Sequence, residues 1–254
     1  MDENKLGGHY LQKYNEELET LRNRVLSMGG LVETQVANAV TALATADLAL
    51  ADDVIQNDVR VNSLEVAIDE HCSEILARHQ PAASDLRFII SIIKTITDLE
   101  RIGDQAEKVA RMAVHLAEKD RPRNQYADVR ALGEKVTRLV HDALDAFARM
   151  DVDTAVNTVR EDVSVDRDYE TVMRQHITFM MEDPRTISRA LDVIWAIRAL
   201  ERIGDHARNM CEYVIYLVRG KDVRHITLDE LERAVQEGRE MAGGKKRAPG
   251  QGEG

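Results

Sequence analysis

The sequence is poor in the residues that build β-structure and mark irregular loops. Only 4 of its 254 residues are proline, and aromatic residues make up 4%. A β-sandwich or β-barrel needs many short strands rich in aromatic residues and separated by turn residues. The composition therefore argues against these folds. Hydrophobic residues at 44% and charged residues at 31% instead indicate a folded helical protein rather than a disordered one.

The sequence also lacks long apolar segments. No apolar run approaches the roughly 18 residues that a membrane span needs. The first residues, Met1 to Lys5, have neither the basic region nor the apolar region of a signal peptide. These absences predict a cytoplasmic protein that reaches a membrane only through partners. The two cysteines, Cys72 and Cys211, fit a reducing compartment, and we expect both to be buried as small apolar residues.

Positive charge is in short supply, since the formal net charge is −11. Nucleic acids and anionic lipids need a basic protein surface, so neither is expected as the main partner. An acidic surface instead favours divalent cations or basic patches on other proteins.

A five-residue motif, Glu-Arg-Ile-Gly-Asp, occurs at 100–104 and again at 201–205. Each copy lies inside a segment with helical apolar periodicity, so Glu100 and Asp104 share one helix face, as do Glu201 and Asp205. Two like charges four residues apart destabilise a helix by a few tenths of a kcal/mol, unless a cation neutralises them. The repetition of this cost indicates that a metal ion or an arginine lies nearby.

The apolar periodicity predicts three helices, a linker and three more helices. Pro81 and Pro184 are expected to end helices, Gly220 to stop the last one, and 119–125 to form the linker. The expected helices cover about 9–46, 47–79, 82–116, 127–150, 151–181 and 185–218. We therefore predict an all-α fold of two similar three-helix bundles, each able to bury its own core. A single extended coiled coil is the alternative.

These bundles correspond to domains at 9–118 and 127–219, followed by a tail at 220–254 that is largely flexible at its end. We expect helix glycines to permit close packing of neighbouring helices. These are Gly29, Gly30, Gly103 and Gly204.

The middle helix of each unit carries a second polar pair. Asp162 and Asp166 lie four residues apart in the second unit, and Asp58 and Asn62 in the first. In a three-helix bundle these pairs can face the repeated motif across one groove. Converging carboxylates bind hard or borderline cations such as Mg²⁺, Ca²⁺, Mn²⁺ and iron. The candidate metal ligands are Asp58, Asn62, Glu100, Asp104, Asp162, Asp166, Glu201 and Asp205.

An arginine ladder between the helices would satisfy the same carboxylates and stays open as the other interpretation. Arg101 and Arg202 lie within the motif itself, and three further arginines are near in sequence. These are Arg60, Arg167 and Arg198.

The sequence gives no positive argument for catalysis. No Glu-x-x-His pair of the di-iron enzymes is present, and no phosphate-binding loop or nucleophile signature is found. We therefore predict a protein that is not an enzyme. The alternatives are a metal-dependent phosphatase that uses the acidic groove, and a metal-storing or purely structural bundle.

Over about 9–226 the chain resembles the PhoU family of bacterial phosphate-uptake accessory and regulatory proteins. The resemblance rests on several short motifs together. They are Met28-Gly29-Gly30, Gln80-Pro81 with Ser84 to Arg87, Leu99 to Asp104, Phe147 to Asp151, and Ile203 to Asp205 with Asn209. It implies two three-helix bundles. It also implies metal clusters, often of iron or zinc, on Glu/Asp-x-x-x-Asp motifs. The pairs 100/104, 162/166 and 201/205 match that motif, whereas Asp58 with Asn62 departs from it.

The resemblance also implies a role. Such proteins are negative regulators of the phosphate starvation response and modulate phosphate uptake. They connect the ATPase subunit of a phosphate ABC transporter to a phosphate-sensing histidine kinase, and no catalysis is established for them. A homodimer or higher oligomer is implied, but no sequence feature indicates the interface.

Overall fold

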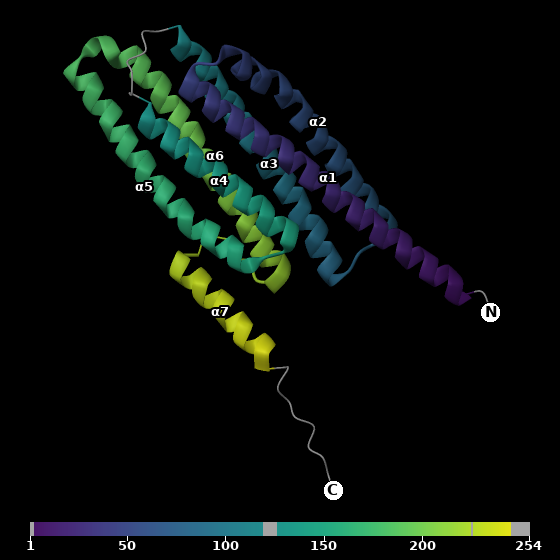
Figure 1. Ribbon diagram of the computed structural model, residues 1–254. Helices are drawn as coiled ribbons and strands as arrows, with labels where there is room; N and C mark the ends of the chain where they lie inside the picture. Colours follow the sequence, from purple (N-terminus) through teal and green to yellow (C-terminus); the bar gives the residue numbers. More distant parts are fainter. Residues whose placement is uncertain (1–2, 119–125, 225, 245–254) are drawn as a thin grey trace.

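The computed structural model describes residues 3–118, 126–224 and 226–244, and within these ranges the regular elements are all helical. Six long helices and one shorter helix follow in order (Figure 1). They are α1 (Glu3–Thr45), α2 (Leu48–His79), α3 (Ala83–Ala117), α4 (Ala127–Arg149), α5 (Val152–Glu182), α6 (Ile187–Arg219) and α7 (Leu228–Gly244), with the 3-10 turn η1 (Pro184–Thr186) before α6.

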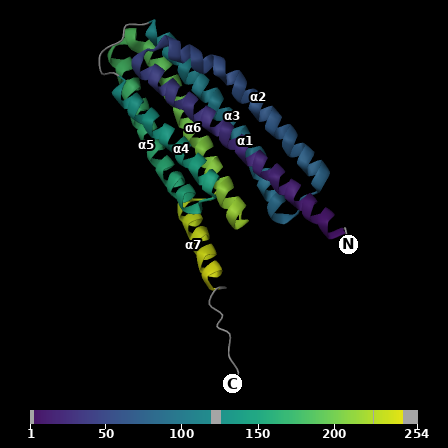
Figure 2. The same ribbon diagram turned by 45° about the vertical axis from the view of Figure 1, so that its right-hand side comes forward.

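The long helices form two three-helix bundles that lie side by side (Figures 1 and 2). Helices α1, α2 and α3 make the first bundle, and α4, α5 and α6 make the second. The bundles meet through α1 against α4 and through α3 against α6, which leaves α2 and α5 on the outside. This confirms the predicted fold class, and the coiled-coil alternative is wrong.

The helix pairs that join the bundles, α1 with α4 and α3 with α6, are antiparallel. Close approaches between α1 and α4 show this directly for the first pair. A Cβ atom on Gly29 would lie 2.3 Å from Leu144 Cδ2, and one on Gly133 would lie 2.6 Å from Val40 Cγ1. Residues with higher numbers in α1 therefore contact residues with lower numbers in α4. The close packing predicted for Gly29 is therefore confirmed. The prediction for Gly30 is wrong, because a Cβ atom there would meet nothing within 4 Å.

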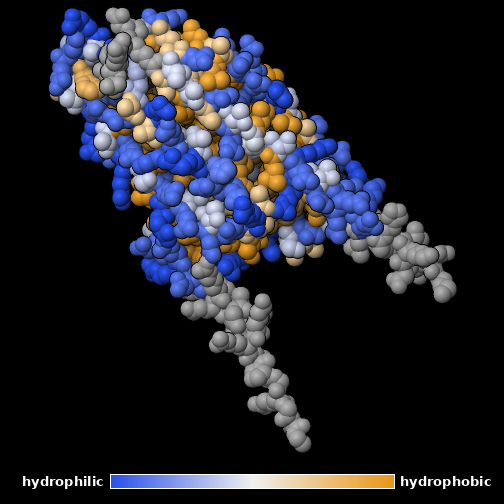
Figure 3. Space-filling model, in the orientation of Figure 1, coloured by the Kyte–Doolittle hydropathy of each residue, from blue (hydrophilic) through white to orange (hydrophobic). Residues whose placement is uncertain are grey.

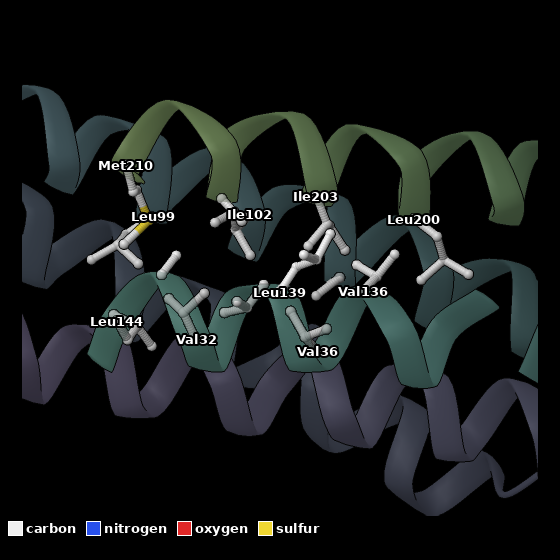
Figure 4. Close-up of a cluster of buried hydrophobic side chains, with 14 of the residues drawn as sticks. Val32, Val36, Leu99, Ile102, Val136, Leu139, Leu144, Leu200, Ile203 and Met210 are labelled. Atoms are coloured by element: carbon white, nitrogen blue, oxygen red, sulfur yellow. The ribbon is translucent and has the colours of Figure 1, made fainter. Parts of the chain in front are cut away.

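The two bundles share one core. Figure 4 shows side chains of α1, α3, α4 and α6 pointing into the same space, and all of those named belong to one continuous buried cluster. The expectation that each unit buries its own core needs correction, because α3 and α6 pack against each other as well as within their own bundles, and the buried residues form one cluster. The labelled residues are Val32, Val36, Leu99, Ile102, Val136, Leu139, Leu144, Leu200, Ile203 and Met210.

The helix ends follow local sequence signals. Asp47 and Asp151 cap α2 and α5, because their carboxylates accept backbone N–H groups of the first turn. Gly220 ends α6 with a φ of 70°, as predicted for a left-handed stop. Gln80 ends α2 in the same region with a φ of 45°, and Pro81 prevents any continuation.

Helix α7 is an element that we did not predict. Leu231 and Val235 are buried, and Arg160 Nε of α5 donates to Glu232 Oε1 at 3.1 Å. Part of the predicted tail is thus a helix packed on α5. The predicted linker 119–125 and the chain end 245–254 lie outside the described residues, and the exact domain boundaries stay a prediction.

The surface is mostly hydrophilic and the two cysteines are buried, as the composition leads us to expect. Hydrophilic residues cover most of the face in Figure 3, with apolar seams between them. No helix among the described residues is long and apolar enough to cross a membrane. Both cysteines are buried, as predicted, and burial raises the pKa of Cys72 to about 12.

Two glycines of the α1–α4 pair are expected to respond oppositely to alanine. Gly133→Ala should destabilise the protein by about 1–3 kcal/mol, because the stiff Val40 side chain must move. Gly30→Ala should stabilise it by about 1 kcal/mol, because a methyl group there fits and alanine favours the helix. Urea unfolding followed by circular dichroism measures both, and equal signs would contradict the packing described.

Candidate metal centre

The second bundle brings its four predicted acids to one place. Asp162 and Asp166 lie one turn apart on α5, and Glu201 and Asp205 lie one turn apart on the neighbouring α6. Gly204 allows the two helices to approach, since a Cβ atom there would lie only 2.9 Å from Asp162 Oδ1. A larger residue would push the Asp162 carboxylate aside.

Three of these carboxylates converge closely enough to hold one ion. One oxygen each from Asp166, Glu201 and Asp205 lies within 4.8 Å of the other two. Oxygen ligands lie about 2.0–2.6 Å from Mg²⁺ or Ca²⁺, so two ligands of one ion are at most about 5 Å apart. In the described part of the chain this is the one such group of three. Asp205 is exposed and Glu201 is half-buried, so an ion can enter from solvent.

Asp162 lies beneath this group with its side chain 2% exposed. Its Oδ2 has no hydrogen-bond partner in the structure, and Arg208 Nη1 is 3.9 Å away, beyond hydrogen-bond reach. Burial, followed by the charges of Asp166 and Asp205, raises the pKa of Asp162 to about 7. A buried carboxylate without a full set of partners is costly, and a nearby cation would relieve that cost.

Glu201 has one satisfied oxygen and one free oxygen. Arg198 Nη1 donates to Oε1 at 3.0 Å, whereas Oε2 has no hydrogen-bond partner. Burial and then Asp205 raise the pKa of Glu201, and burial and then Asp166 raise that of Asp205. The donor set and the unpaired oxygen therefore fit an oxygen-preferring cation.

The arginine ladder is realised only in part. Of the five arginines considered, Arg198 forms an ion pair with a site acid, and Arg208, which we did not consider, approaches Asp162. Arg101 and Arg202 are exposed, and among the described residues neither forms an ion pair with a site acid. Arginines thus neutralise part of the negative charge at Glu201 and Asp162, and the rest of the cluster stays acidic.

The first bundle places its four candidate residues on two neighbouring helices in the same way, but it carries one carboxylate fewer. Asn62 Nδ2 donates to Asp58 Oδ2 at 3.0 Å, so the residue that departs from the motif satisfies its neighbour. Burial and then Asp104 raise the pKa of Glu100, so Glu100 and Asp104 still repel. No group of three carboxylates forms among the described residues of this half. Whether these four residues bind metal stays a prediction.

A buried polar contact beside the site escaped the sequence analysis. Asp98 on α3 lies 2.7 Å from His206 Nδ1 and accepts a hydrogen bond from Asn209 Nδ2 at 3.2 Å, both on α6. His206 thus points away from the acid group and ties the two bundles together. The available signal was an aspartate in an apolar segment where the second repeat has Ala199.

Both repeats of the chain match one known family. The family described as "PhoU domain" matches twice, at residues 25–113 and 129–214. A Pseudomonas putida protein named phosphate-specific transport system accessory protein PhoU homolog is 55% identical over 236 residues, 93% of this chain and 92% of the relative. The Escherichia coli (strain K12) phosphate-specific transport system accessory protein PhoU is 47% identical over 237 residues, 92% of this chain and 97% of that one.

Solved structures agree. The crystal structure of PhoU from Pseudomonas aeruginosa superposes with a TM-score of 0.80 at 57% identity, covering 82% of this chain and 100% of that chain. A phosphate transport system regulatory protein PhoU from Streptococcus pneumoniae gives a TM-score of 0.75 at 31% identity, covering 83% and 99%. With both repeats matched and the fold shared along nearly the whole length of these relatives, the chain belongs to the PhoU family.

Proposed function

We propose that this protein is a non-catalytic regulator of phosphate transport that lowers the phosphate starvation response when phosphate is plentiful. In this proposal it connects the ATPase subunit of a phosphate ABC transporter to a phosphate-sensing histidine kinase in the cytoplasm, and it approaches the membrane only through them. The observation that carries the proposal is the family membership, with relatives named as accessory proteins of phosphate-specific transport. The expected homodimer or higher oligomer is part of the same proposal.

Direct binding tests this role. The full chain is immobilised, and the purified ATPase subunit and the cytoplasmic part of the kinase are passed over it with and without phosphate and Mn²⁺. We expect both to bind, with a response to phosphate or metal. Binding of neither under all four conditions would refute the adaptor role. Metal-dependent release of phosphate from model esters, abolished by Glu201→Gln, would favour the phosphatase alternative instead.

We further propose that Asp166, Glu201 and Asp205 hold a metal ion, with iron, zinc, manganese and magnesium as the candidates. The unpaired Glu201 oxygen and the mutual repulsion of the three carboxylates support this proposal. A bound ion would neutralise the groove between α5 and α6. The first-half set of Asp58, Asn62, Glu100 and Asp104 would be a weaker second site, because Asn62 removes one negative charge.

The metal proposal gives a matched pair of variants. Elemental analysis of gently purified protein should find metal in the wild type and at least about a tenfold loss in Glu201→Gln/Asp205→Asn, because two of three ligands lose their charge. The corresponding variant in the first bundle, Glu100→Gln/Asp104→Asn, should lose less. Adding Mn²⁺ should raise the melting temperature of the wild type, since the native state alone offers the site. Equal metal content in all three proteins would contradict the assignment.

A further inference from the structure

Buried oxygens without a hydrogen-bond partner gather at the two acid sites. Amide and carboxylate oxygens can only accept hydrogen bonds, so burying one without a donor costs free energy. The described part of the chain holds five such oxygens, and four of them belong to candidate metal ligands named above. The fifth belongs to Gln35 of α1, which no motif marks. The five are Gln35 Oε1, Asp58 Oδ1, Asn62 Oδ1, Asp162 Oδ2 and Glu201 Oε2.

Gln35 reaches the same place as Asp58 of α2. It is 3% exposed, so water from the surface does not solvate its amide. A Cβ atom on Gly103 of α3 would lie 3.5 Å from Gln35 Oε1 and 3.3 Å from Asp58 Oδ1. Gln35 Nε2 donates to the backbone carbonyl of Val54 at 3.5 Å, and the amide oxygen is the atom that faces Gly103. Two unpartnered oxygens therefore line the space that this glycine leaves between three helices.

Asn62 adds a third acceptor. Its Nδ2 donates to Asp58 Oδ2 at 3.0 Å, which leaves Asp58 Oδ1 and Asn62 Oδ1 without a donor. A water molecule donates only two hydrogens, so one water could not satisfy these two atoms and Gln35 Oε1 together. Glu100 and Asp104 add negative charge from α3, and among the described residues neither forms an ion pair. An oxygen-preferring cation supplies the positive charge that this region lacks.

The second bundle shows that the fold does not require a glutamine at this place. The offset of 104 residues that aligns the middle helices of the two bundles also aligns Gln35 with Leu139. The structure agrees with this alignment, because Leu139 Cδ1 would lie 3.7 Å from a Cβ atom on Gly204, the counterpart of Gly103. The polar side chain is therefore specific to the bundle in which Asn62 takes the place of a carboxylate.

We propose that Gln35 is a cation ligand of the first bundle, whose amide oxygen binds the ion together with Asp58 and Asn62, alongside Glu100 and Asp104. This inference rests on the metal proposal made above, and it adds a ligand from a third helix that neither repeated motif contains. Amide and carboxylate oxygens together suit Mg²⁺, Ca²⁺ and Mn²⁺. The first bundle should therefore select these ions over zinc.

The test is calorimetric titration of the full-length, chelator-treated protein with Mn²⁺. All variants are made in a Glu201→Gln/Asp205→Asn parent, so that the remaining Mn²⁺ binding belongs to the first bundle. Gln35→Leu should raise the Kd for Mn²⁺ by at least about tenfold, because one ligand oxygen is lost. The fold accepts leucine at the equivalent Leu139, so this variant should fold. Gln35→Glu should bind Mn²⁺ at least as tightly as the parent, because it keeps an oxygen there and adds negative charge.

Thr95→Val is the matched control, because Thr95 is also buried with an unpartnered oxygen but lies about two turns of α3 before Gly103. It should leave the Kd unchanged. The inference is overturned if the parent binds no Mn²⁺, if Thr95→Val weakens binding as much as Gln35→Leu, or if Gln35→Leu changes only the metal-free stability. Failure of the wild type to bind Mn²⁺ would refute the metal proposal as well, whereas equal Kd values for the parent and Gln35→Leu would refute the role of Gln35 alone.

Discussion

Replacing Ile203 with alanine is expected to lower the free energy of unfolding by about 2–5 kcal/mol. Ile203 is fully buried and points into the space between the four central helices (Figure 4). Helices of both bundles line this space, so the cavity would weaken both bundles at once. We therefore expect the variant to unfold in one transition, shifted to lower denaturant concentration.

Two probes can test this expectation. Circular dichroism follows all helices, whereas the fluorescence of Trp195 follows α6 of the second bundle alone. Urea curves from the two probes should coincide in the wild type and in Ile203→Ala. Val59→Ala, at an exposed site on α2, controls for the loss of an apolar side chain without a cavity and should change stability little. Two separated transitions would show that the bundles are independent units.

Replacing Asp162 with asparagine is expected to stabilise the metal-free protein at pH 8. The folded-state pKa of Asp162 is about 7, above the ordinary value of 3.8. Because the folded state holds this proton more tightly, the contribution of Asp162 to stability is full below pH 3.8 and is lost as the pH rises to about 7. The difference between these two pKa values corresponds to roughly 4 kcal/mol, and asparagine, which stays neutral, avoids that loss.

The measurement is the free energy of unfolding by urea in the presence of a chelator, at steps between pH 5 and pH 8. The advantage of Asp162→Asn over the wild type should grow from pH 5 to about pH 7 and then level off, because over that interval the unfolded wild type has released a proton that the folded state still holds. Asp52→Asn, at an exposed position of α2, removes one charge without burial and should show no such trend. An advantage that stays constant or shrinks with pH would place the Asp162 carboxylate in a better-solvated environment than the one described.

Much of the fold was predictable because periodicity and helix ends are local signals. The buried positions of α4 follow the apolar spacing, and Gly220 ends α6 through its left-handed conformation. Helix α7 was missed although it carries a signal, a capping box in which Glu230 accepts a hydrogen bond from the backbone N–H of Thr227. Only two of its described side chains, Leu231 and Val235, are buried apolar residues, too few to form a clear apolar stripe.

The sequence was enough to predict which acids of the second bundle lie together. It was not enough to predict which of them are buried or which have polar partners. Repetition and four-residue spacing placed Glu201 and Asp205 together and opposite α5. The burial of Asp162 depends on how closely α6 approaches at Gly204, and pairwise distances of that kind leave no periodic pattern. The contact between Asp98 and His206 joins residues 108 positions apart, so no local sequence pattern indicates it.

The antiparallel pairing of α1 with α4 and of α3 with α6 has a consequence for an isolated half of the chain. A fragment ending near residue 118 would expose the faces of α1 and α3 that α4 and α6 normally cover. Because the missing helices are copies of those it retains, two such fragments offer each other a nearly equivalent surface. Expressed alone, either half should therefore recover its lost contacts by pairing with an identical fragment.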